Sequence, residues 1–135
     1  MGSLRRIAFV YMVILLAAAS LNYIPGLTDA EGRAFGVFAL DIFDDALHVA
    51  SALWAGIAAA TSSRASRIFL RYFGLLYFTD GLLGLAAGSG YLDLGIVHHG
   101  VIHLSLAFKI LANLPHIGGG AFAIFSSVRF AHEAR

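Results

Sequence analysis

The stretch "DIFDDALHVASALWAG", residues 41–56, decides how the chain folds. Its apolar residues predict a membrane-spanning helix, because an apolar run of about 20 residues is long enough to cross a bilayer. The start of the stretch, however, carries four polar side chains that are costly in hydrocarbon. They are Asp41, Asp44, Asp45 and His48. We therefore expect these side chains to face the interior of a helix bundle, where they can find partners.

The composition supports a membrane protein. Of the 135 residues, 59% are hydrophobic and 13% are charged, whereas about a quarter of the residues of a soluble domain are charged. A chain this short cannot bury so much apolar surface in one core. We predict an all-α integral membrane protein with a single domain over residues 1–135. The net charge of +1 gives no basic footprint for nucleic acid, so the lipid bilayer is the expected partner. The absence of cysteine excludes disulfides and thiolate ligands.

Four apolar segments predict four transmembrane helices, over residues 7–24, 35–60, 68–87 and 94–114. Pro25 follows the first segment and Pro115 follows the fourth, and proline commonly ends a helix. Residues 120–130 are apolar but too short to span a bilayer. This last segment predicts a helix that lies at the membrane interface.

The positive residues predict the orientation, because Lys and Arg concentrate on the cytoplasmic side. If both termini are cytoplasmic, one side holds Arg5, Arg6, Arg64, Arg67, Arg71, Lys109, Arg129 and Arg135. The opposite side then holds Arg33 alone. We predict a multi-pass protein of the plasma (inner) membrane with both termini inside.

Two segments of the sequence suggest an internal repeat. "DDALHVASAL", residues 44–53, aligns with "HGVIHLSLAF", residues 99–108, so that His48 matches His103. A repeat of two spans keeps its orientation and gives a symmetry axis along the membrane normal. The prediction is a bundle of four helices built from two parallel two-helix repeats, with the second and fourth spans facing each other.

Three motifs resemble a known family. They are "YIPGLT" (residues 23–28), "DDALHVASALWAG" (44–56) and "RASRIFLRYFGLLYFTDGLLGL" (64–85). Together they resemble the small bacterial four-span membrane proteins catalogued as domain of unknown function 4383. The resemblance implies a four-span fold with a histidine in the second span and another in the fourth, at the positions of His48 and His103. Asp45 stands where that family usually has Asn. The resemblance implies no activity.

The histidines and acids also suggest a metal site. Asp44 with His48, and His99 with His103, are i, i+4 pairs, the spacing at which a helix presents two ligands on one face. Carboxylate and imidazole suit Zn²⁺, Fe²⁺ or Mn²⁺. We therefore predict that these four residues bind a divalent transition metal. Three further acids would orient the imidazoles or add a ligand. These are Asp41, Asp45 and Asp80.

Two alternatives stay open. His48 and His103 could hold haem b between facing helices in an electron carrier. The acids and histidines could instead form a structural network without a metal, in a proton- or ion-coupled protein or in an assembly subunit. A homo-oligomer or a larger membrane complex fits either alternative. No catalytic motif assigns a reaction. The remaining histidines are expected outside the site, at headgroups, the interface or the tail: His98, His116 and His132.

Overall fold

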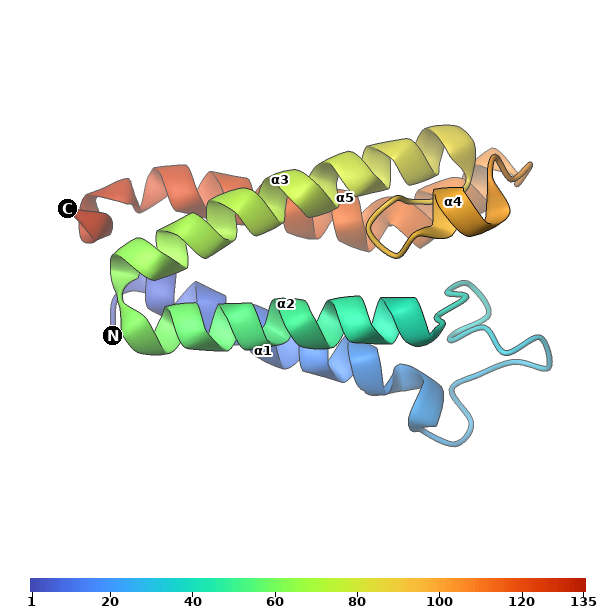
Figure 1. Ribbon diagram of the computed structural model, residues 1–135, viewed down its shortest axis with the longest axis horizontal. Helices are drawn as coiled ribbons and strands as arrows, with labels where there is room; N and C mark the ends of the chain where they lie inside the picture. Colours follow the sequence, from blue (N-terminus) through green and yellow to red (C-terminus); the bar gives the residue numbers. More distant parts are fainter.

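The computed structural model describes residues 1–135, and all its regular elements are helices joined by irregular loops (Figure 1). Its long helices are α1 (Ser3–Ser20), α2 (Ile42–Thr61), α3 (Ser63–Ala87) and α5 (Leu106–Arg129). Its short helices are η1 (Leu21–Tyr23), α4 (Gly95–His99) and η2 (Ala131–Ala134). Three helical segments are long and apolar enough to cross a membrane: Ser3–Tyr23, Ile42–Thr61 and Ser63–Ala87. The predictions of an all-helical chain and of long apolar helices are confirmed.

The long helices form two side-by-side pairs, α1 with α2 and α3 with α5. Both termini and the tight turn between α2 and α3 lie at one end of the molecule, here called the terminal end (Figure 1). The turn is short because Ser62 caps α3 at once, its Oγ accepting a hydrogen bond from Ala65 N at 3.0 Å. The longer connections, residues 24–41 and 88–105, lie at the opposite end, here called the loop end.

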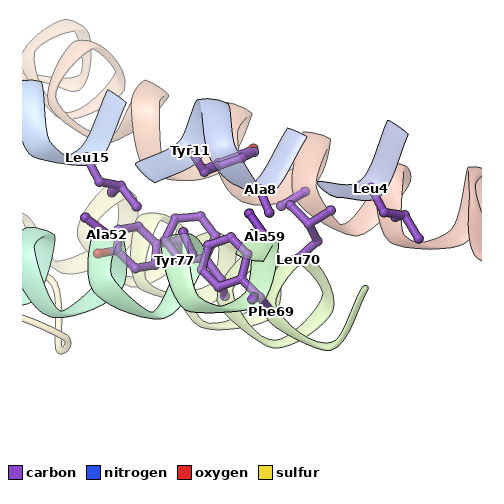
Figure 2. Close-up of a cluster of buried hydrophobic side chains, with 13 residues drawn as sticks. Leu4, Ala8, Tyr11, Leu15, Ala52, Ala59, Phe69, Leu70 and Tyr77 are labelled. Carbon is purple, nitrogen blue, oxygen red and sulfur yellow. The ribbon is translucent and has the colours of Figure 1, made fainter. Parts of the chain in front are cut away.

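A column of aromatic rings forms the core between α1 and α3 (Figure 2). The ring of Tyr11 packs edge-on against Phe73 at 5.2 Å, and Phe73 stacks on Tyr77 at 4.1 Å between centroids. Small side chains let α2 approach this column, since Ala52, Ala55, Ala58 and Ala59 are all buried. Such small residues are typical of helices that pack closely in membranes.

The second predicted span begins later than expected. Residues 35–41 do not join the helix, which starts at Ile42 after the N-cap Asp41. The preceding segment forms a loop in which Asp29 accepts hydrogen bonds from the backbone and the guanidinium of Arg33, at 2.8 and 3.1 Å. Asp41 therefore lies at the start of α2 and is exposed.

The prediction of a helix over residues 94–114 is wrong. α4 ends at His99 and is followed by Gly100, whose φ of 63° is readily adopted by glycine. The next long helix is capped by Ser105. α5 then continues through Pro115 to Arg129, so no separate helix forms over 120–130. Pro115 is tolerated because α5 packs against α3, as proline often is in packed membrane helices.

Because α5 starts at Leu106, the prediction that Lys109 lies on the same side as the termini is wrong. Lys109 lies near the start of α5, at the loop end, where its Nζ donates to Ala86 O at 3.4 Å. Of nine Lys and Arg residues, all but Arg33 and Lys109 therefore lie toward the terminal end, which is 9 − 2 = 7. Of eight Asp and Glu residues, only Glu133 lies at that end. The molecule is thus basic at the terminal end and acidic at the loop end.

The two segments of the expected repeat differ in structure. Residues 44–53 are continuous helix within α2, whereas residues 99–108 cover the last residue of α4, an irregular stretch and the first turn of α5. His48 is therefore helical and buried, while His103 lies outside any helix and is exposed.

Candidate functional site: an Asp–His cluster at the loop end

The first two acids of α2 serve the start of the helix. Asp41 Oδ1 accepts hydrogen bonds from Phe43 N at 2.8 Å and from Asp44 N at 3.1 Å. Asp44 Oδ2 accepts one in return from Asp41 N at 3.1 Å, which completes a capping box. Acids are also favoured at a helix N-terminus by the helix dipole. These contacts explain why an otherwise apolar helix carries Asp41 and Asp44.

The third acid connects α2 to the end of the first helix. Tyr23 Oη, in η1, donates to Asp45 Oδ2 at 2.8 Å. The other oxygen of this carboxylate, Asp45 Oδ1, is buried without a protein partner. The contact holds Tyr23, the residue just before the 24–41 loop, against α2.

Asp80, near the loop end of α3, is the most fully paired acid of the group. Its side chain is almost completely buried, with the residue 3% exposed. Oδ1 accepts from Tyr91 N at 2.6 Å and from Leu92 N at 2.8 Å, while Oδ2 lies 2.7 Å from His116 Nδ1. The loop can fold over the carboxylate because residue 90 is glycine, since a Cβ there would lie 2.6 Å from Asp80 Oδ1.

The contact with Asp80 orients the imidazole of His116 on α5. A carboxylate accepts but cannot donate when ionised, so Nδ1 of His116 carries the hydrogen of this bond. In the neutral ring, Nε2 then holds the free lone pair. In many functional sites a carboxylate fixes the tautomer of a histidine in this way. The structure therefore leaves Nε2 of His116 for another partner.

Further polar groups surround His116. The ring of Tyr77 packs edge-on against the imidazole at 4.9 Å, and that of His48 lies 6.5 Å away between centroids. Tyr77 Oη is paired with Ser51 Oγ at 3.0 Å. His48 is 7% exposed, and its Nδ1 is buried without a hydrogen-bond partner. α2, α3 and α5 thus contribute to one polar cluster inside an otherwise apolar bundle.

The four residues predicted to bind a metal are not brought together as expected. Asp44 and His48 are buried on α2, but His99 and His103 are exposed and share no helix. The geometry of two i, i+4 pairs on facing helices is therefore wrong. No group of three or more His, Asp or Glu side chains in the structure is placed to hold a metal ion. Binding of a metal, or of haem b by His48 and His103, stays a prediction.

Of the acids expected to support the metal site, Asp41 and Asp45 have the partners described above, and Asp80 pairs with His116. His98 and His132 are exposed, as expected, with the His98 ring against Phe43. His116, which was expected outside the cluster, lies within α5 and belongs to it through its contact with Asp80. The sequence does carry a signal for this position, because Asn113, His116 and Gly120 share one face if the helix is uninterrupted. Pro115 concealed this signal, because proline commonly ends a helix.

Comparisons of the chain with protein-family models, with curated proteins and with solved structures find no match.

Proposed function

We propose that the chain is a multi-pass protein of the plasma (inner) membrane, with α1, α2, α3 and α5 as its four spans. α5 has 24 residues, or about 36 Å at 1.5 Å per residue, which exceeds the roughly 30 Å of a hydrocarbon core. α5 contains one lysine and one arginine, and these lie near its two ends: Lys109 and Arg129. The basic terminal end favours cytoplasmic termini.

We further propose that His116 takes up and releases a proton within this bundle, with Asp80 as its fixed partner. This proposal rests on the 2.7 Å contact between His116 Nδ1 and Asp80 Oδ2, which leaves Nε2 of His116 free. With a neutral imidazole the pair carries one negative charge, and protonation of Nε2 makes the pair neutral overall. A neutral pair is less costly in a medium of low dielectric constant. The protein is therefore a proton-coupled membrane protein, acting alone or as a subunit.

The titratable groups nearest His116 come from α3 and α2. They are Asp80 and Tyr77 of α3 and His48 and Asp44 of α2.

The proposal is tested by following the histidine nitrogens by ¹⁵N NMR of the protein in lipid bilayers. As the pH is lowered through the range in which histidine titrates, His116 Nε2 is expected to gain a proton while Nδ1 keeps its own. His116→Asn assigns the signal, because the amide of Asn stands where Nδ1 stood and can still donate to Asp80. This variant should keep the thermal stability and lose one titrating signal.

His132→Asn provides the matched control, since His132 is exposed at the terminal end. It should remove one histidine signal and leave that of His116 unchanged. An imidazole at position 116 that keeps one protonation state throughout the titration would show that the Asp80–His116 pair only holds α3 and α5 together.

A further inference from the structure

A cavity of about 560 Å³ lies between α1 and α5, with side chains of α2 and α3 at its floor. Its wall is apolar over much of its length, and Val10, Ile14 and Phe122 on its rim are also exposed on the outer surface. The cavity therefore opens sideways from the bundle. In the membrane proposed above, this opening faces the hydrocarbon of the lipid, and a ligand would enter from the bilayer.

The cavity has five polar side chains. Arg6 lies toward the terminal end, and the others are Tyr11, His48, Tyr77 and His116. The two phenols are already paired, since Tyr11 Oη donates to Gly119 O at 2.5 Å and Tyr77 Oη pairs with Ser51 Oγ. The two imidazoles are not fully paired, since His48 Nδ1 has no partner and His116 uses only Nδ1. A buried polar atom without a partner is costly, so the buried Nδ1 of His48, beside the free Nε2 of His116, indicates the polar head of a ligand.

The shape and lining of the cavity define the ligand class. Ligand cavities of about 300–1,000 Å³ with a mostly apolar wall and a few polar groups suit small organic molecules. Near the histidines, Phe73 and Tyr77 also present rings to the cavity, and such rings pack well against a planar head. The part of the wall that α1 supplies extends from Arg6 to Ala18, which is about 18 Å at 1.5 Å per residue. The cavity therefore has room for a planar head and for the first part of a flexible apolar tail.

We propose that this cavity binds a lipid-soluble quinol: a planar ring with hydroxyl groups and an apolar tail. A hydroxyl of the ring donates to His116 Nε2, which is an acceptor while Nδ1 donates to Asp80. A quinone has only carbonyl acceptors and cannot make this bond, so the reduced form binds more tightly when His116 is neutral. The tail leaves past Val10, Ile14 and Phe122. The proposal concerns binding and rests on the membrane embedding and the neutral His116 described above.

The test measures binding of a decyl-tailed benzoquinol to the full chain in phosphatidylcholine nanodiscs, with the corresponding quinone as the comparison. We expect saturable binding of the quinol and binding of the quinone that is weaker by about tenfold, which corresponds to one hydrogen bond of about 1.4 kcal/mol. His116→Asn should abolish this preference. Equal binding of the two forms would overturn the assignment of Nε2 as the acceptor.

A pair of variants on the outer surface of α1 tests the position of the ligand. Val10→Trp fills the rim of the cavity and should weaken quinol binding by about tenfold or more. Val13→Trp is the matched control, because Val13 is similarly exposed on α1 but does not line the cavity. Equal binding by both variants, or displacement of the quinol by dodecane, would overturn the proposal. Failure here leaves the NMR titration of His116 intact, so the two proposals fail separately.

Discussion

Gly120 of α5 lies directly against the backbone of Gly74 of α3. A Cβ at position 120 would lie 2.8 Å from Gly74 O and 2.5 Å from Phe78 N. Both obstacles are backbone atoms, so the helices themselves would have to move apart. The same close approach brings His116, one turn before Gly120, within hydrogen-bond distance of Asp80.

Gly120→Ala is therefore expected to destabilise the protein by about 1–3 kcal/mol, the usual cost of overpacking a close contact. Thermal unfolding in detergent would measure the loss. Gly118→Ala is the control, because a Cβ at position 118 meets no atom within 4 Å and alanine is the better helix former. Equal stability of the two variants would contradict the close packing of α3 and α5.

The topology can be read from single cysteines, because the chain has none of its own. Ala30→Cys lies in the exposed loop after α1, and Thr61→Cys lies at the exposed end of α2. With cytoplasmic termini, an impermeant maleimide added to intact cells should label position 30 and reach position 61 only after the membrane is opened. The reverse pattern would invert the proposed orientation.

The C-terminal segment should detach from α1 in acid. Glu133 Oε2 accepts a hydrogen bond from Leu4 N at 3.1 Å, in the first turn of α1. This backbone hydrogen bond holds the pKa of Glu133 below its ordinary value. A lowered pKa means that the contact stabilises the folded state above the ordinary glutamate pKa, and that this stability is lost as the pH falls through the lowered pKa.

Hydrogen exchange at the Leu4 amide would measure this detachment. After correction for the pH dependence of the intrinsic exchange rate, the amide should be less protected at acid pH. Glu133→Gln should remove the pH dependence, whereas Glu31→Gln, in the loop at the opposite end, should not. A Leu4 amide protected equally at all pH values would contradict the role of the carboxylate.

The sequence predicted the helical class, the long apolar helices and the need of the acids of α2 and α3 for partners. It could not place α5, because a proline and a glycine-rich run look like a helix end unless the packing against α3 is known. It also could not separate acids that cap a helix from acids inside the bundle, because that depends on whether α2 starts at residue 35 or at Ile42. His116 was missed as the partner of Asp80 because the course of α5 through Pro115 was not foreseen.

Removal of the Asp80 charge should reverse the tautomer of His116. In Asp80→Asn, the amide oxygen is expected to stay with the backbone donors of Tyr91 and Leu92, since buried N–H groups are costly to leave unpaired. The amide nitrogen then faces His116 and donates to Nδ1, so the ring hydrogen moves to Nε2.

The ¹⁵N shifts of the His116 ring at high pH would show this exchange directly, with Nδ1 protonated in the unsubstituted protein and Nε2 protonated in the variant. Asp93→Asn is the control, because Asp93 accepts from Gly95 N in the loop and makes no hydrogen bond to His116. Asp80→Asn should also lose the preference for the quinol over the quinone, since a protonated Nε2 can no longer accept from a hydroxyl and can donate to either form. An unchanged tautomer in Asp80→Asn would mean that the carboxylate does not set the state of the imidazole, and the proton-coupling proposal would lose its basis.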